Sequence, residues 1–108
     1  MVSFNRPLSA LALTLAGIVA ANTVHADAAL AASRNCFACH TVDRKVVGPP
    51  YRDVARKYAG QPAAVEKLAA KIRQGGAGVW GVVPMPANPQ VSEAESRKLA
   101  AWVLSLGG

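Results

Sequence analysis

The segment Cys36-Phe37-Ala38-Cys39-His40 brings two thiols and an imidazole together, which no other part of the chain does. Its C-x-x-C-H spacing is the attachment signature of c-type haem. Each cysteine can add across a haem vinyl group to form a thioether, and the histidine that follows is carried to the iron as an axial ligand. We therefore expect one haem c per chain, attached covalently through Cys36 and Cys39, with His40 on the iron.

Three other interpretations of these residues compete with haem attachment: a structural disulfide, a thioredoxin-like dithiol and part of a zinc site. A tetrahedral zinc site needs four ligands, and the only further Cys or His is His25. A thioredoxin-like dithiol follows a strand in a βαβ unit, and no segment here alternates like a strand. All three interpretations are therefore weaker than haem attachment.

The second axial position of the iron has a candidate by elimination. Outside residues 1–26 the chain has one methionine, Met85, and one histidine, His40. Lysine is a hard, strongly hydrated donor that is protonated at neutral pH. Met85 is therefore the predicted second ligand, and the neighbouring Pro84 and Pro86 stiffen the backbone that presents its sulfur.

An iron with protein groups on both axial positions has no open site for oxygen, peroxide or substrate. This favours outer-sphere electron transfer over bond-making chemistry.

The alternative from a different functional class is a haem enzyme or gas sensor in which Met85 does not bind the iron. Such chemistry usually needs a distal acid-base residue, and outside residues 1–26 no second histidine supplies one. A third hypothesis keeps electron transfer but makes the chain a haem subunit of a larger complex.

The N-terminal residues have the pattern of a secretory signal. Arg6 precedes the fourteen-residue apolar stretch Leu8–Ala21, and small residues at the −3 and −1 positions suit cleavage after Ala26. The stretch is shorter than the ~20 residues of a membrane-spanning helix, which argues against an uncleaved anchor. We expect residues 1–26 to be a cleaved signal and residues 27–108 to form one exported domain in the periplasm, where covalent haem attachment takes place.

The charge and size of this domain limit its partners. The chain has 12 Lys and Arg against 6 Asp and Glu, a formal net charge of +6 that falls to +5 when Arg6 leaves with the signal. No stripe of aromatic and basic residues suggests binding to nucleic acid. The surplus of positive charge is therefore expected to steer the domain to redox partner proteins, which it binds only transiently. We expect the domain to be a monomer that does not insert stably into a membrane. A domain this small needs a stabilising cross-link or cofactor, and we expect the haem to fill this role.

Helical patterns cover most of the exported domain, with no competing strand signal. A first helix is expected over Asp27–Arg34, with the charge of Asp27 at its N-terminus and the haem motif at its C-terminal end. A short second helix is expected over Asp53–Ala59. Pro62 is expected to open a third helix in its first turn, and the Gly75-Gly76 pair to end it.

The last helix has the clearest boundaries. Ser92 and Glu95 form the S-x-x-E capping box that starts it, and Gly107 ends it. The third and last helices each carry an apolar stripe at helical spacing. These stripes are Val65, Leu68, Ala69 and Ile72 in the third helix, and Leu99, Trp102, Val103 and Leu106 in the last. Glycines and prolines exclude regular structure between Gly75 and Ser92, and so long a loop in a small domain usually has a function.

Several segments of this chain occur together in one known family. They are Cys36–His40, Val47-Gly48-Pro49, Tyr51 with Asp53-Val54-Ala55, Gly78-Val79-Trp80-Gly81, Pro84-Met85-Pro86 and Trp102-Val103-Leu104-Ser105. On these segments the chain resembles the small bacterial class I cytochromes c of the cytochrome c-551/c-552 group, over essentially all of residues 28–108. The resemblance implies an all-α fold, the class I cytochrome c fold, with four to five short helices wrapped around one covalently bound haem.

The function that the resemblance implies is a periplasmic carrier of single electrons, with His40 and Met85 as axial ligands. Such carriers shuttle electrons between respiratory chain components, such as a cytochrome bc complex and a terminal oxidase or nitrite reductase.

The resemblance also implies four supporting residues around the haem. The carbonyl of Pro49 would accept the imidazole N–H of His40, which fixes the tautomer of the ring. Trp80 would donate its indole N–H to a haem propionate, and Lys71 would lie near the same propionate. Asn88 would donate a hydrogen bond to the ligating sulfur. From the residues alone, Pro49 and Asn88 are equally well explained as turn formers.

Overall fold

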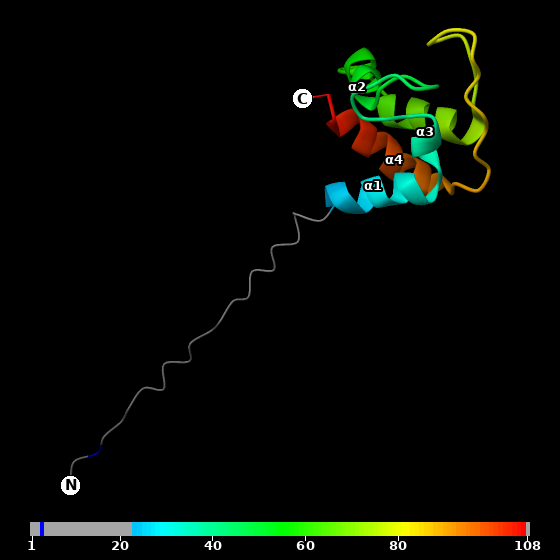
Figure 1. The fold of residues 1–108 in the computed structure, drawn as a ribbon. Helices are drawn as coiled ribbons and strands as arrows, with labels where there is room; N and C mark the ends of the chain where they lie inside the picture. Colours follow the sequence, from blue (N-terminus) through cyan, green and yellow to red (C-terminus); the bar gives the residue numbers. More distant parts are fainter. Residues whose placement is uncertain (1–2, 4–22, 108) are drawn as a thin grey trace.

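The computed structural model describes Ser3 and residues 23–107, and these residues contain helices and no strand. In chain order the elements are α1 (Thr23–Ser33), the short 3-10 helix η1 (Cys36–Ala38), α2 (Tyr51–Tyr58), α3 (Ala64–Gln74) and α4 (Glu93–Ser105), as Figure 1 shows. The prediction of four to five short helices is confirmed. None of the described helices has the length and apolar character needed to cross a membrane. The predicted signal, residues 1–26, lies outside the described residues except for Ser3 and its last four residues.

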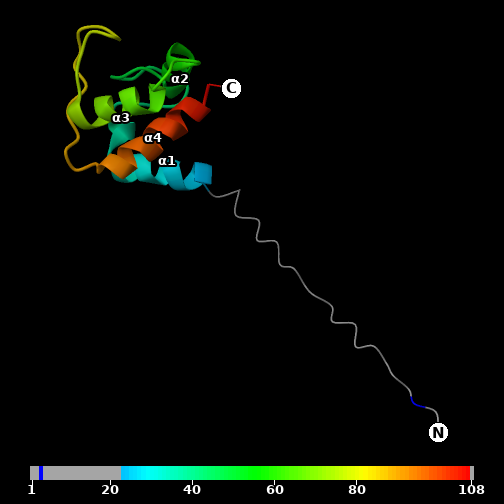
Figure 2. The same cartoon turned by 180° about the vertical axis from the view of Figure 1, so that it is seen from behind.

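Helix α4 is the centre of the fold, because it contacts α1, α2 and α3. Figures 1 and 2 show α4 running between α1 and α3, with α2 near its C-terminal end. Its inward face buries Leu99, Trp102 and Val103, and α3 buries Leu68 and Ala69 against it. The other members of the two predicted stripes are partly buried and pack against this core. Both stripes are therefore confirmed as core-facing.

The predicted capping box holds the N-terminus of α4. The Ser92 hydroxyl accepts the backbone N–H of Glu95 at 3.1 Å, and one carboxylate oxygen of Glu95 accepts the backbone N–H of Ser92 at 3.1 Å. The other carboxylate oxygen accepts Nη2 of Arg34 at 2.7 Å, which ties the end of α1 to the start of α4. The Arg34 guanidinium beside Glu95 holds the pKa of that carboxyl below its usual value.

Replacing Glu95 with glutamine is expected to lower the free energy of unfolding at neutral pH. The amide keeps the capping geometry but loses the charge that Arg34 binds. Because the pKa of Glu95 is lowered in the folded state, its charge stabilises fully above the usual glutamate pKa of about 4.3. That contribution is lost as the pH falls through the lowered value. Denaturant unfolding of the holoprotein at a series of pH values should show the deficit of Glu95→Gln shrinking toward acid.

Ser92→Ala is the control for this experiment. It removes a neutral acceptor at the same helix end, so we expect a loss of about 1 kcal/mol that changes little with pH. A Glu95→Gln deficit of the same size at neutral and acid pH would contradict the role of the charge.

Helix α1 begins at Thr23, four residues before the predicted start at Asp27. In the uncleaved chain Asp27 therefore lies in the second turn, and the predicted helix start at Asp27 is wrong for this chain. The reason is that no Gly or Pro separates Thr23 from Asp27, so the alanine-rich segment is helical further upstream. The position of the Asp27 charge at a helix N-terminus was predicted for the chain cleaved after Ala26 and stays a prediction. The helix ends at Ser33, one residue before its predicted end, and two residues separate it from Cys36, so the haem motif follows its C-terminal end as expected.

Helices α2 and α3 also begin away from their predicted starts. Helix α2 starts two residues early, at Tyr51, because Pro50 holds extended backbone (φ −60°, ψ 142°) directly before it. Helix α3 starts at Ala64, so Pro62 is not in its first turn and that prediction is wrong. The residue between them, Ala63, has left-handed backbone with a φ of 58°, which a right-handed helix cannot include.

Candidate haem site

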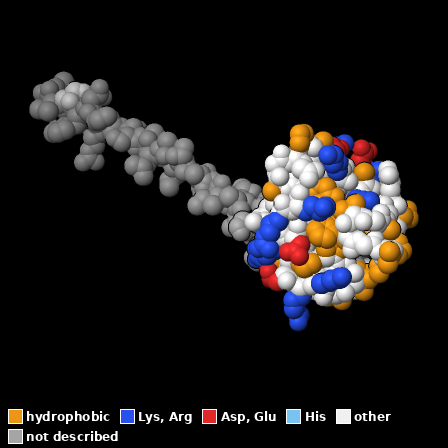
Figure 3. Space-filling model, turned by 90° about the horizontal axis from the view of Figure 1, so that it is seen from above, with side chains coloured by type: hydrophobic (Ala, Val, Ile, Leu, Met, Phe, Trp, Pro, Cys, Tyr) orange, Lys and Arg blue, Asp and Glu red, His pale blue; other side chains and the backbone are white. Residues whose placement is uncertain are grey.

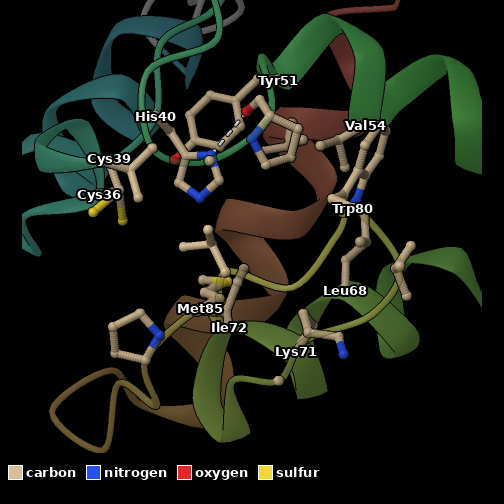
Figure 4. A pocket seen from close by; sticks show the side chains of 18 of the residues that line it. Cys36, Cys39, His40, Tyr51, Val54, Leu68, Lys71, Ile72, Trp80 and Met85 are labelled. Atoms are coloured by element: carbon tan, nitrogen blue, oxygen red, sulfur yellow. Dashed lines mark hydrogen bonds between the residues drawn. The ribbon is translucent and has the colours of Figure 1, made fainter.

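A largely apolar cavity of about 1020 Å³ lies between the η1–α2 segment and α3 with its following loop, as Figure 4 shows. Its volume is at the upper end of the ~300–1,000 Å³ common for ligand and cofactor sites. Val54 of α2, Leu68 of α3 and Leu99 of α4 are among the side chains that close it. Every predicted site residue lines this one cavity: Cys36, Cys39, His40, Pro49, Lys71, Trp80, Met85 and Asn88.

The haem motif lines one wall of the cavity because the chain turns tightly around it. Asn35 has left-handed backbone with a φ of 62°, which turns the chain out of α1 and into η1. The backbone N–H of His40 then donates to the carbonyl of Cys36 at 3.0 Å. Figure 4 shows both cysteine sulfurs on one side of the cavity, next to the imidazole. Burial raises the pKa of the Cys36 thiol.

The imidazole of His40 is 9% exposed and is held from two sides. Its Nδ1 lies 2.9 Å from the carbonyl oxygen of Pro49, the contact that the family resemblance implied. Nδ1–H therefore donates to this carbonyl, and Nε2 keeps the lone pair that can bind a metal ion. The ring also stacks on Tyr51, with centroids 4.9 Å apart and an 18° angle between the planes. Burial raises the pKa of the Tyr51 phenol, so this stacking partner is neutral.

Gly48 leaves room for the His40 ring, because a Cβ atom at this position would lie 2.8 Å from Nδ1 and 2.9 Å from Nε2. Gly48→Ala is therefore expected to displace the imidazole and to weaken its proposed bond to iron. Visible spectra of the purified holoprotein should show a lower haem content or a changed axial ligation. Gly60→Ala is the control for general destabilisation: its φ of 72° strains the backbone of an alanine, but the Cβ meets no atom within 4 Å, so the haem spectrum should stay unchanged. A Gly48→Ala spectrum identical to that of the unsubstituted protein would contradict the close contact.

Met85 reaches the cavity from the opposite wall, on the loop that follows α3, and Figure 4 shows it across from His40. Its backbone is paired with that of Gly76. The N–H of Gly76 donates to the carbonyl of Met85 at 3.0 Å, and the N–H of Met85 donates to the carbonyl of Gly76 at 2.8 Å. Gly75 permits this approach, since its φ is 71° and a Cβ would lie 2.7 Å from the backbone nitrogen of Ala87. The two predicted ligands thus face each other from distant parts of the chain.

Lys71 and Trp80 lie on the side of the cavity away from the cysteines, as Figure 4 shows. The propionates of haem stand on the two pyrrole rings that lack vinyl groups. A haem attached through Cys36 and Cys39 would therefore direct its propionates toward this side. An ammonium group and an indole N–H are both suitable donors to a carboxylate, so the two residues fit the propionate end of a haem.

Asn88 makes different contacts from those that the resemblance implied. Its amide group donates to the carbonyls of Ile72 at 2.9 Å and Pro86 at 3.2 Å, rather than to the sulfur of Met85. Its backbone N–H also donates to the carbonyl of Arg73 at 3.1 Å. The reason is that the last carbonyls of α3 have no partner within the helix. Asn88 satisfies them and ties the loop that carries Met85 to the end of α3.

Gly48 and Tyr51 also lie against the His40 ring, and no role was predicted for either residue. Tyr51 also joins an aromatic cluster, with its ring centroid 6.2 Å from that of Phe37 and 5.4 Å from that of Trp102. The signals for them in the sequence were their place among the segments that carry the family resemblance and their position on either side of the Pro49-Pro50 pair.

The fold and the cavity together define a small helical protein that holds one covalently attached haem. The family model for cytochrome c matches residues 26–107, and the chain belongs to the cytochrome c family. Membership makes it an electron carrier that works with redox partners, and not an enzyme. The predicted cofactor, covalently bound haem c, is confirmed, and the C-x-x-C-H motif at the wall of the cavity fits its attachment.

Relatives and a solved structure agree with this assignment. The chain is 49% identical over 89 residues to cytochrome c-552 of Nitrosomonas europaea, which covers 82% of this chain and 86% of the relative. It is 54% identical over 93 residues to cytochrome c-552 of Hydrogenobacter thermophilus, which covers 85% of this chain and 88% of the relative. The crystal structure of wild-type Nitrosomonas europaea cytochrome c552 matches with a TM-score of 0.72 at 52% identity, over 73% of this chain and 98% of that one. The predicted class I cytochrome c fold is confirmed.

Proposed function

We propose that this chain carries single electrons in the periplasm through one haem c whose iron is bound by His40 and Met85. The observation that supports this most strongly is that these two donors, from separate segments, face each other across one apolar cavity. With side chains on both axial positions, no site is open to oxygen or substrate, and outer-sphere electron transfer is what such an iron can do. When bound, the haem supplies an iron that gains and loses one electron.

The surroundings of each ligand suit this role. The carbonyl of Pro49 fixes the tautomer of His40 and makes Nε2 a better donor. The thioether of Met85 is a soft donor that favours the ferrous state and raises the reduction potential relative to two histidines. The apolar walls exclude water, which disfavours the more highly charged ferric state.

Three further residues support the cofactor in this proposal. Lys71 and Trp80 bind a propionate on the side of the cavity away from the cysteines. Asn88 acts through the loop, because its hydrogen bonds to the carbonyls of Ile72 and Pro86 hold the segment that presents Met85. None of these three residues needs to contact the iron.

We further propose that residues 1–26 direct export and are removed after Ala26, which leaves residues 27–108 as a periplasmic monomer. Its redox partners would be respiratory components such as a cytochrome bc complex and a terminal oxidase or nitrite reductase. Figure 3 shows Lys and Arg side chains around exposed apolar side chains on one face, and the net charge is positive. Contacts steered by such charges are weakened by salt, which suits fast release.

One optical experiment tests the proposed ligation. Spectra of the purified holoprotein are recorded oxidised, then reduced, then reduced with carbon monoxide. We expect the weak far-red band of a thioether on ferric haem, a sharp α band on reduction and no response to carbon monoxide. Absence of the far-red band together with rapid carbon monoxide binding would show an open iron and refute the proposal. Mass spectrometry of the periplasmic fraction tests export, with Asp27 expected as the first residue.

A further inference from the structure

Trp80 stands on a loop that the backbone closes on itself. The paired backbones of Gly76 and Met85 form the base of this loop, which comprises residues 77–84. Within it, the N–H of Gly78 donates to the carbonyl of Gly81 at 2.9 Å, so the chain turns tightly around Trp80. The Trp80 side chain is 44% exposed and is not part of the buried core. Core packing therefore does not explain what holds the indole at the cavity.

A contact with Lys57 can hold the Trp80 indole at the cavity. The Nζ of Lys57 lies 5.5 Å from the centroid of the Trp80 ring, within the distance at which an ammonium group is attracted to the face of an indole. Lys57 lies in the last turn of α2, and this helix is fixed by the buried Val54 and Ala55. The cation is thus anchored to a packed helix, whereas the indole belongs to a loop.

The same helix also supports the histidine. Tyr51, in the first turn of α2, stacks on the ring of His40, and Lys57 at the other end contacts Trp80. Helix α2 therefore reaches both the predicted iron ligand and the residue that we assign to the propionate. A loop attached to α2 keeps a fixed position relative to the histidine.

We propose that Lys57 is a positioning residue of the haem site: it binds the face of Trp80 and so holds the loop of residues 77–84 against α2, with the indole at the propionate side of the cavity. Lys57 itself does not line the cavity and acts through Trp80. This inference rests on the proposed function, because it assigns Trp80 to the propionate end of a bound haem.

The test compares the reduced holoprotein with three variants, Lys57→Met, Lys57→Arg and Lys67→Met. The readout is the hydrogen-exchange rate of the Trp80 indole N–H by NMR, assigned with Trp80→Phe. Methionine keeps the apolar stem but has no charge, whereas arginine keeps the cation over the ring. Lys67→Met is the matched control, since it removes the same charge from an exposed lysine on α3 that does not line the cavity.

We expect Lys57→Met to accelerate this exchange about two- to fivefold, as loss of an exposed cation–π contact predicts. Lys57→Arg should restore the original rate, and Lys67→Met should leave it unchanged. Equal rates in Lys57→Met and the unsubstituted protein, or the same acceleration in Lys67→Met, would overturn the inference. The oxidised spectrum separates this failure from failure of the proposed function: without a far-red thioether band in the unsubstituted protein the ligation is wrong, whereas with the band and unchanged exchange only the role of Lys57 is wrong.

Discussion

Met85→Ala is expected to open the iron to external ligands while the haem stays covalently attached through Cys36 and Cys39. The oxidised variant should lose the far-red thioether band, and the reduced variant should bind carbon monoxide. The reduction potential should fall by on the order of 0.1 V or more, within the roughly 0.8 V over which axial ligands set haem potentials. The reason is that the thioether favours the ferrous state, and apart from His40, which is assigned to the other axial position, residues 27–108 contain no histidine or further methionine to replace it.

Gln74→Ala is the control for this variant. Gln74 is an exposed residue at the end of α3, directly before the loop of Met85, and does not line the cavity, so its truncation should leave the spectrum and the potential unchanged. A Met85→Ala protein that keeps the far-red band and ignores carbon monoxide would mean that another group binds the iron. Titration of each variant against redox mediators, with spectra at every potential, gives both readouts from one sample.

The chain without haem is expected to lose its cooperative fold. The cavity has a volume of about 1020 Å³, and among the residues whose burial the structure describes the largest fully buried side chains are only Val91 and Ser96. At about 24 cal/mol per Å³, a dry void of this size would cost more than the about 5–15 kcal/mol that stabilise a whole domain. The walls must therefore collapse or admit water, and in either case the apolar contacts that the haem would make with α2, α3 and α4 are lost. Far-UV circular dichroism of the Cys36→Ser/Cys39→Ser chain during heating should show a broad change without a cooperative transition.

The single variant Cys36→Ser is the control for this experiment. It keeps one thioether and the whole cavity lining, so it should still melt cooperatively in the haem-bound form. A haem-free chain whose melt matches that of the holoprotein in midpoint and steepness would show that the protein core suffices without the cofactor.

Local signals in the sequence predicted the elements that need no distant partner. The capping box of Ser92 and Glu95 and the apolar stripe of α4 are such signals, and the structure confirms both. Helix starts were less predictable, because the left-handed backbone of Ala63 leaves no trace in its residue type. Ala63 is a good helix former, and the sequence alone favours including it in α3.

The residues of the candidate site likewise divide into those that local sequence signals predict and those that depend on distant parts of the chain. Cys36, Cys39 and His40 could be found because their chemistry depends on adjacent positions. The partners of the Asn88 amide could not, since they are the unpaired carbonyls that the end of α3 brings near it. The contact between Lys57 and Trp80 likewise joins a helix and a loop that are far apart in the sequence.

Because the backbones of Gly76 and Met85 are paired, the length of the loop of residues 77–84 need not affect the position of the Met85 sulfur. Val82 is 93% exposed within this loop, and exposed loop positions of this kind tolerate inserted residues. A peptide inserted at Val82, such as an electrode-binding tag, would lengthen the loop and leave its paired base in place. The length of the loop beyond Trp80 is thereby separated from the geometry of the Met85 ligand, whereas Trp80 in the same loop keeps its assigned role at the propionate.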